Sequence, residues 1–188
     1  MVKEIIFYQH NLKKYKMKKI YLILYYSLIN KIPNSTFLGT NIFNKLRIYF
    51  VKKIMRIGSN NTFQRNVYFG NGNNVVIGNN CQINDNIRFD NVKIGDNVMI
   101  ARDCIFLGKT HNYNDTDTLM TDQGSSLSQQ TIVENNVWIG LRVIIMPGVK
   151  IKKGSIISAG SVLHTDTVLN GVYAGIPARL IKVRGNKE

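Results

Sequence analysis

The sequence predicts an all-β solenoid built from six-residue repeats, because one stretch keeps that period without a break. Residues 133–162 divide into the units VENNVW, IGLRVI, IMPGVK, IKKGSI and ISAGSV. Each unit begins with an aliphatic residue and has a small or short branched residue four positions later. The leading residues are Val133, Ile139, Ile145, Ile151 and Ile157, followed by Leu163. This period fits neither a helix nor an ordinary strand, and it is typical of a coil made of three short flat strands.

The chain is long enough for one such domain with an appendage, since it has 188 residues of which 44% are hydrophobic. We expect a basic helical region over residues 1–56. The solenoid is expected over residues 57–170, with a protruding loop at 107–131, and a C-terminal tail follows over 171–188.

The N-terminal region carries most of the net charge of +14, because it contains 12 Lys and Arg residues and a single acid, Glu4. The pattern predicts one helix over residues 12–30, with lysines crowding its start and an almost wholly apolar second half. Pro33 follows its end. A second helix is predicted over residues 41–55. Its apolar face is expected to cover the first coil and contains Phe43, Leu46, Phe50 and Ile54.

This local basicity leaves three interpretations open: a nucleic acid, an anionic membrane or lipid-linked substrate, or a solvated helix face. No nucleic-acid-binding motif accompanies it, so we expect no nucleic-acid partner. The apolar run at 20–29 is shorter than the roughly 20 residues that span a bilayer. It also lacks the cleavage site of a signal peptide. The expected location is the cytoplasm, with residues 1–30 as a candidate contact to the inner face of the cytoplasmic membrane.

The repeats begin less regularly at Ile57. The unit FGNGNNVV at 69–76 is two residues too long, and FDNVK at 89–93 is one too short. Asparagine is abundant at the expected corners because it tolerates left-handed backbone. The same freedom is expected of the corner glycines, which are Gly140, Gly148, Gly154 and Gly160.

Both cysteines, Cys81 and Cys104, occupy the small inward position of a repeat. Two cysteines are too few for a disulfide framework, so we expect buried, inert thiols in a reducing compartment. Residues 107–131 abandon the repeat for a polar segment that contains His111. A long excursion from a regular scaffold is typical of a binding loop.

The repeats, His111 in its loop, the NNVWIG stretch and the AGIPAR tail together resemble the hexapeptide-repeat acyltransferases, which fold as a left-handed parallel β-helix. Within that superfamily, HNYNDTDTLMTDQG followed by VENNVWIG is similar to bacterial O-acetyltransferases that modify sugars of surface polysaccharides. The resemblance covers about residues 57–182. It implies a homotrimer, acetyl-coenzyme A as donor, and active sites in the clefts between neighbouring chains. No metal is expected.

The resemblance makes His111 the general base. A sugar hydroxyl must lose its proton while it attacks a thioester, and an imidazole titrates near neutral pH. The alternative is a histidine that only holds the loop by hydrogen bonds. Asp115, Asp117 or a backbone carbonyl is a candidate to orient the ring. The oxyanion formed by attack needs a main-chain N–H, for which Gly140 or its neighbour is the candidate.

The resemblance also suggests residues for the acceptor and for coenzyme A. Asn84 matches an acceptor-binding amide, with Asp85 beside it as a second candidate; the alternative is a corner asparagine. Trp138 is expected to point outward and to pack on the pantetheine arm, on a sugar ring or in a subunit interface. The remaining cofactor candidates are Gly140, Ala159, Gly160, Thr165, Arg179 and Lys182. His164 and Thr165 depart from the residues common in relatives at the adenine.

Rival functions on the same coil fit less well. Metal-dependent carbonic anhydrases need three histidines at one site, whereas His10, His111 and His164 lie far apart. Sugar nucleotidyltransferases need a larger preceding domain than 56 residues supply. Serine acetyltransferases have a larger helical domain. The alternative from another class is a catalytically silent scaffold or membrane-associated assembly protein.

Overall fold

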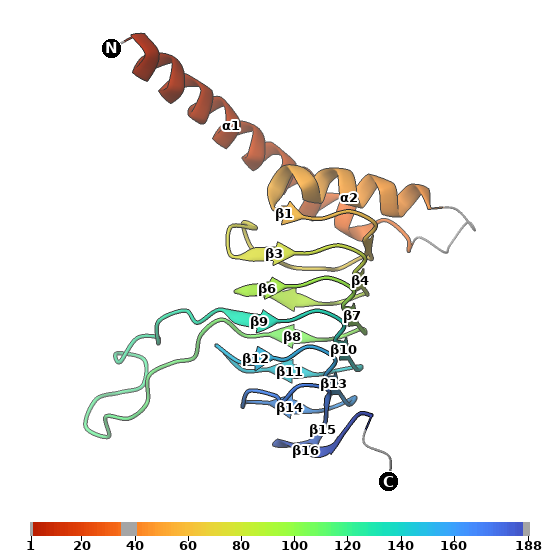
Figure 1. The fold of residues 1–188 in the computed structure, drawn as a ribbon. Coiled ribbons are helices and arrows are strands. Elements are labelled where there is room, and N and C mark those ends of the chain that lie inside the picture. Colours follow the sequence, from red (N-terminus) through yellow and green to blue (C-terminus); the bar gives the residue numbers. More distant parts are fainter. Residues whose placement is uncertain (1, 35–40, 186–188) are drawn as a thin grey trace.

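The computed structural model describes residues 2–34 and 41–185, with side chains from Tyr15 onward, and shows a solenoid with a helical cap (Figure 1). Three sheets form its walls. Sheet 1 contains β1 (Arg56–Ile57), β3 (Val75–Ile77), β6 (Val92–Ile94), β9 (Thr131–Val133) and β12 (Lys150–Ile151). Sheet 2 contains β2 (Thr62–Phe63), β4 (Gln82–Ile83), β7 (Met99–Ile100), β10 (Trp138–Ile139), β13 (Ile156–Ile157), β15 (Gly171–Gly175) and β16 (Ala178–Val183). Sheet 3 contains β5 (Arg88–Phe89), β8 (Ile105–Phe106), β11 (Ile144–Ile145) and β14 (Val162–Leu163).

The chain visits sheets 1, 2 and 3 in turn, so each strand pairs in parallel with the strand one coil away. We call the bends between them the 1–2, 2–3 and 3–1 corners. The one antiparallel pair in the described sheets joins β15 to β16 and closes the C-terminal end. This arrangement confirms the left-handed β-helix expected from the repeats.

The core is the stack of inward residues that begin each repeat. Ile139, Ile145 and Ile151 are fully buried, as are short residues four positions after a leading residue, such as Val143 and Ser155. In sheet 3 the column of Ile145 continues with aromatic residues on the preceding strands, where the rings of Phe89 and Phe106 lie 5.0 Å apart. Burial is therefore periodic along the chain because the coil repeats every three short strands.

Asparagine forms most of the left-handed corners, as predicted. Seven described asparagines have φ between 55° and 59°, for example Asn80 and Asn136. Gly148, Gly154 and Gly160 also have positive φ. The expectation for Gly140 was wrong. It has an ordinary φ, and it is needed because a Cβ there would lie 2.6 Å from the backbone nitrogen of Ala159.

The first helix, α1 (Val2–Ser27), begins ten residues before the predicted start. Residues 2–11 hold no proline or glycine to stop it. The lysines at 13–19 therefore lie in the middle of α1 and not at its start, away from the positive end of the helix dipole. A short 3-10 turn, η1 (Ile29–Lys31), follows. No described helix has the length and apolarity needed to cross a bilayer.

The second helix, α2 (Ile42–Ile54), lies across the first coil and buries Arg47, Val51 and Ile54 (Figure 1). The predicted face was therefore slightly rotated, since Leu46 remains 40% exposed. Arg47 is buried because its guanidinium finds carbonyl partners. It donates to the backbone oxygens of Ile32 and Pro33 and, at 3.5 Å, to that of Phe63. This cation anchors the cap on the solenoid.

Removing a core side chain tests the assignment of inward and outward residues on one strand. Ile94 is buried in β6 and its neighbour Lys93 is exposed. We expect Ile94→Ala to lower the free energy of unfolding by about 2–5 kcal/mol, because it leaves a cavity that the coils above and below cannot fill. Lys93→Ala should change it by less than about 0.5 kcal/mol. Chemical denaturation followed by circular dichroism measures both, and equal effects would contradict the register.

Candidate active site

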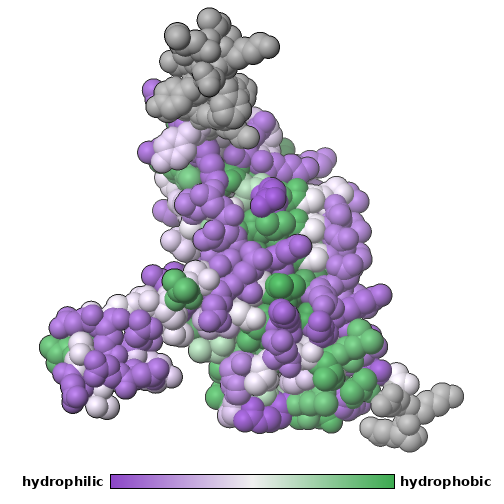
Figure 2. Space-filling model, turned by 60° about the vertical axis from the view of Figure 1, so that its left-hand side comes forward, coloured by the Kyte–Doolittle hydropathy of each residue, from purple (hydrophilic) through white to green (hydrophobic). Residues whose placement is uncertain are grey.

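The loop that carries His111 leaves the solenoid at the 3–1 corner, between β8 and β9, and stands clear of the body (Figures 1 and 2). Its two arms pair near the root. The Ser126 N–H donates to the Thr110 carbonyl at 2.9 Å, and the Asn112 N–H donates to the Gly124 carbonyl at 3.1 Å. His111 lies between these bonds, with an exposed side chain. The backbone of the base candidate is therefore held while its ring faces solvent.

The tip of the loop is organised by Asp115. One carboxylate oxygen accepts the Thr118 hydroxyl at 2.6 Å, and the other accepts the Asp117 N–H at 2.9 Å. The hydrogen bond from Thr118, followed by that from Asp117, lowers the pKa of Asp115. Gln123 closes the tip by donating to the carbonyl of Asp115 at 2.7 Å. Asp115 thus holds the loop in shape, and the structure shows neither it nor Asp117 bonded to the His111 ring.

Four of the predicted site residues gather at the 2–3 corner. The Asn84 side chain donates to the Ile100 carbonyl at 2.8 Å. One and two coils further on, Ala101 and Gly140 occupy equivalent positions, with N–H groups that donate to the carbonyls of Ile139 and Ile157. Ala159 and Gly160 lie against Gly140 and Leu141, since the Gly160 N–H donates to the Leu141 carbonyl at 2.7 Å. The corner has no room for a side chain at Gly140.

This arrangement corrects one detail. The Gly140 N–H is already bonded to Ile157 at 2.8 Å, so it is not free for an oxyanion. The neighbouring residue, Leu141, then becomes the candidate donor at this corner. Trp138 precedes it on β10, between Met99 and Ile156 of the adjacent strands. Its indole is 49% exposed, as the phase of the repeat predicts, and it forms a flat apolar surface beside the corner.

Asp85 faces the cap, although the sequence placed it beside the acceptor. Its side chain accepts a hydrogen bond of 3.0 Å from the Asn34 amide, and it is only 9% exposed. The buried Arg47 contributes a favourable charge nearby. Asp85 therefore ties the segment after η1 to the second coil, next to Asn84.

The cofactor candidates from the tail lie at the C-terminal end. Arg179, on β16, approaches His164 with 3.4 Å between the guanidinium Nη1 and the imidazole Nε2. His164 and Thr165 follow β14 and so lie at the 3–1 corner. Lys182 is exposed on β16. His164 and Thr165 therefore lie on the corner of the loop root, whereas Arg179 and Lys182 lie on sheet 2, paired with Ala174 and Val172.

Asp90 was overlooked in the sequence. It follows β5 at the 3–1 corner, where one carboxylate oxygen pairs with Arg88 Nε at 2.9 Å and the other accepts the Gly108 N–H at 3.4 Å. It thus supports the first residues of the loop from the preceding coil. The shortened unit FDNVK was the available signal, because a missing residue marks a modified corner.

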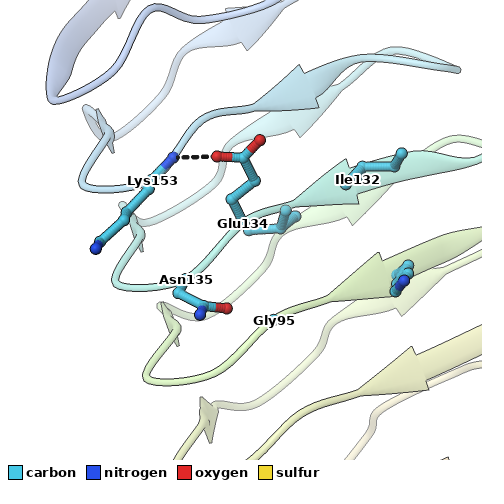
Figure 3. Close-up of a pocket in the computed structure, with 7 residues that line it drawn as sticks. Gly95, Ile132, Glu134, Asn135 and Lys153 are labelled. Carbon is cyan, nitrogen blue, oxygen red and sulfur yellow. Dashed lines mark hydrogen bonds between the residues drawn. The ribbon is translucent and has the colours of Figure 1, made fainter.

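The two groups of candidates are not brought together within one chain. His111 extends from the 3–1 corner, whereas Asn84, Gly140 and Ala159 lie at the 2–3 corner, on the opposite edge of sheet 3. The described residues contain no group of three His, Cys, Asp or Glu placed to hold a metal ion. A shallow hollow of about 330 Å³ lies elsewhere, at the edge of sheet 1, where Glu134 accepts the Lys153 N–H at 2.9 Å (Figure 3).

Both cysteines are buried, as predicted, and their thiols hydrogen-bond to backbone carbonyls. Burial raises the pKa of Cys81, and it raises the pKa of Cys104 to about 11. Near neutral pH both groups are therefore thiols, which are poor nucleophiles.

We expect the folded protein to react with iodoacetamide at less than about a tenth of the rate of a free thiol at pH 8, because both burial and a raised pKa suppress the thiolate. Complete labelling should follow unfolding in guanidinium. Mass spectrometry measures both states. Rapid labelling of the native protein, or an acetylated Cys81 or Cys104 after incubation with acetyl-coenzyme A, would contradict this prediction.

Comparisons with known proteins agree with this architecture. Residues 130–165 match the family model described as bacterial transferase hexapeptide (six repeats). The galactoside O-acetyltransferase of Escherichia coli K12 is 37% identical over 135 residues, which are 70% of this chain and 65% of that protein. Its counterpart from Lactococcus lactis is 32% identical over 131 residues, 67% of this chain and 61% of that protein. The chain thus matches less than two thirds of the length of these curated relatives.

Solved structures match over more of the chain. A galactoside acetyltransferase in complex with coenzyme A has a TM-score of 0.73 and 31% identity, covering 91% of this chain and 80% of that one. A maltose O-acetyltransferase from Clostridium difficile 630 has a TM-score of 0.69 and 26% identity, with coverage of 92% and 87%. With its repeats, its corner geometry and these relatives, the chain belongs to the hexapeptide-repeat acyltransferases.

Proposed function

We propose that this protein transfers an acetyl group from acetyl-coenzyme A to a hydroxyl of a sugar in a bacterial surface polysaccharide or its precursor. The observation that carries the proposal is an exposed imidazole on a loop that is braced at its root, on a coil whose opposite corner is too narrow for a Cβ. Relatives named galactoside and maltose O-acetyltransferases support sugar as the acceptor. A silent scaffold does not require such a loop.

The working unit in this proposal is a homotrimer, because one chain separates its candidates at two corners. Three of the four outward residues of sheet 3 between these corners are apolar and partly exposed, namely Ile105, Ile144 and Val162, and the fourth is Arg88. On sheet 1 the outward residues include Lys93 and Lys150 instead. Packing sheet 3 against neighbouring copies would set the 3–1 corner of one chain beside the 2–3 corner of the next.

In that cleft His111 would take the proton from the acceptor hydroxyl while its oxygen attacks the thioester carbonyl. The new C–O bond makes a tetrahedral oxyanion, which the Leu141 N–H of the other corner would stabilise. Collapse of the intermediate breaks the C–S bond, and the imidazolium returns the proton to the leaving thiolate. Asn84 would contribute to the acceptor side, with Asp85 bracing the coil beside it, and no acyl-enzyme forms.

The remaining candidates would hold coenzyme A. Ala159 and Gly160 offer backbone against which the pantetheine arm can lie, and Trp138 offers an apolar face beside them. Thr165, Arg179 and Lys182 would face the adenine and phosphate end, since they lie at the C-terminal edge of the coil.

Mixed trimers test the shared site directly. His111→Ala and Asn84→Ala should each reduce thiol release from acetyl-coenzyme A with a galactoside acceptor by about a hundredfold or more. If the two residues act from different chains, trimers reassembled from equal amounts of both variants should recover roughly a quarter of the wild-type activity. His10→Ala is the matched control. Inactive mixtures would contradict a site between chains, and an active His111→Ala would contradict the base.

We also propose that α1 places the enzyme at an anionic membrane surface, the inner face of the cytoplasmic membrane in a bacterium. One side of its second half packs against α2 and the first coil through Tyr21, Tyr25 and Tyr26. The other side is an exposed apolar strip beside Lys16 and Lys19. The strip consists of Met17, Ile20, Ile23, Leu24 and Leu28. An apolar strip flanked by lysines suits a helix that lies in the interface of anionic lipids.

Replacing two residues of this strip should weaken binding to phosphatidylglycerol vesicles. We expect the double variant Ile20→Ser with Ile23→Ser to bind the vesicles with roughly tenfold lower affinity, because less apolar surface enters the interface. Sedimentation of the protein with increasing amounts of vesicles measures this affinity. Ile42→Ser, equally exposed but on α2, should have little effect. An unchanged affinity would overturn the proposal. So would a change in oligomeric state, which would show that another copy covers the strip.

A further inference from the structure

A second hollow, of about 390 Å³, lies where α1, α2 and the first coil meet. It is lined by one residue of α1, by the end of α2, by the start of β1 and by the corner loop of the eight-residue repeat. The lining residues are Lys18, Lys52, Lys53, Ile54, Met55, Arg56, Gly72 and Asn73. Four separate elements therefore contribute to one depression, on the 3–1 corner at the capped end of the solenoid.

The lining contains four cations and no acid. None of the four forms an ion pair with a side chain in 15–34 or 41–185, whereas Arg88 and Lys152 on the solenoid pair with Asp90 and Glu134. Lys52 and Lys53 suit the negative end of the α2 dipole. That reason does not extend to Lys18 and Arg56, which come from other elements. The excess positive charge therefore lacks an acidic partner among the side chains that the structure describes.

The hollow is also built rather than incidental. The Lys18 ammonium is held at its edge by a hydrogen bond of 2.6 Å to the Asn73 side chain. The floor is closed by Gly72, where φ is +75° and a Cβ would lie 2.9 Å from that of Met55. Partial burial lowers the pKa of Lys18, so a bound anion would favour its charged form.

We infer that this hollow binds a phosphoryl group, as a monophosphate or a diphosphate. Four cations around one small depression match the compact multiple charge of a phosphate better than a single carboxylate. The ligand has two sources with this chemistry. One is the headgroup of an anionic lipid, and the other is a phosphate or diphosphate carried by the acceptor itself.

The position of the hollow gives the second source a structural basis, and this step rests on the proposed function. Arg56 begins sheet 1, and the His111 loop rejoins that sheet at β9, three strands further on. At about 4.8 Å per strand, the hollow lies roughly 14 Å along the 3–1 corner from the loop root. A sugar phosphate or sugar diphosphate anchored here would extend its ring toward His111.

Pyrophosphate binding to the full-length protein, measured by isothermal titration calorimetry without acetyl-coenzyme A, tests the site. We expect Lys18→Gln to weaken binding about tenfold, because it removes one charge and its hydrogen bond. The pair Lys52→Gln and Lys53→Gln leaves the Lys18 contact to Asn73 intact and should weaken binding as much. Lys45→Gln, an exposed lysine of α2 outside the hollow, is the matched control.

Vesicles distinguish the sources. If the same variants weaken binding to phosphatidylglycerol vesicles but not to pyrophosphate, the ligand is a lipid headgroup; if they weaken pyrophosphate binding, a soluble or acceptor phosphate fits. Equal binding by all variants and Lys45→Gln in both assays would overturn the inference. His111→Ala should bind pyrophosphate normally, so a failure of the acetyl-transfer proposal remains separable from a failure of this site.

Discussion

The vertical stacking of inward side chains is the constraint on which the structure depends. Ile139, Ile145 and Ile151 fill their columns only if every coil returns to the same three directions. Residues inserted into the repeat therefore loop out of the solenoid at a corner, where they do not disturb the stacked side chains. The His111 loop and the FGNGNNVV insertion both do so, and both leave at the 3–1 corner. Regular packing thus concentrates variation, and with it the candidate chemistry, along one edge of the prism.

The two corners beside sheet 3 have complementary characters. The 3–1 corner carries projecting polar groups, including His111, Asp90 and His164. The 2–3 corner is tight, with Gly140 pressed against Ala159. The 3–1 corner offers polar side chains, and the 2–3 corner offers backbone with no room for a larger side chain at Gly140. Neither alone resembles a complete site for a thioester and a sugar, and the apolar face between them explains why copies of the chain would supply both.

The sequence predicted the solenoid well because its period is local and repeated many times. Burial at Val133, Ile139 and Leu163 follows directly from their phase. It predicted the helical cap less well. Arg47 looks like a surface residue in a basic helix, and only the carbonyl oxygens of Ile32 and Pro33, brought close by the fold, make its burial favourable. The role of Asp115 in the loop tip was hidden for the same reason, since it depends on contacts with Thr118 and Gln123.

The antiparallel strand β16 has a consequence for assembly. All other described strands in sheet 2 run in one direction, so the open side of β15 would otherwise be a template for the first coil of another molecule. A reversed strand presents a different hydrogen-bonding pattern, and at the opposite end α2 covers the first coil. Growth of fibres from stacked prisms is thereby discouraged at both extremities, which leaves the sides of the prism for the association that the proposed trimer requires.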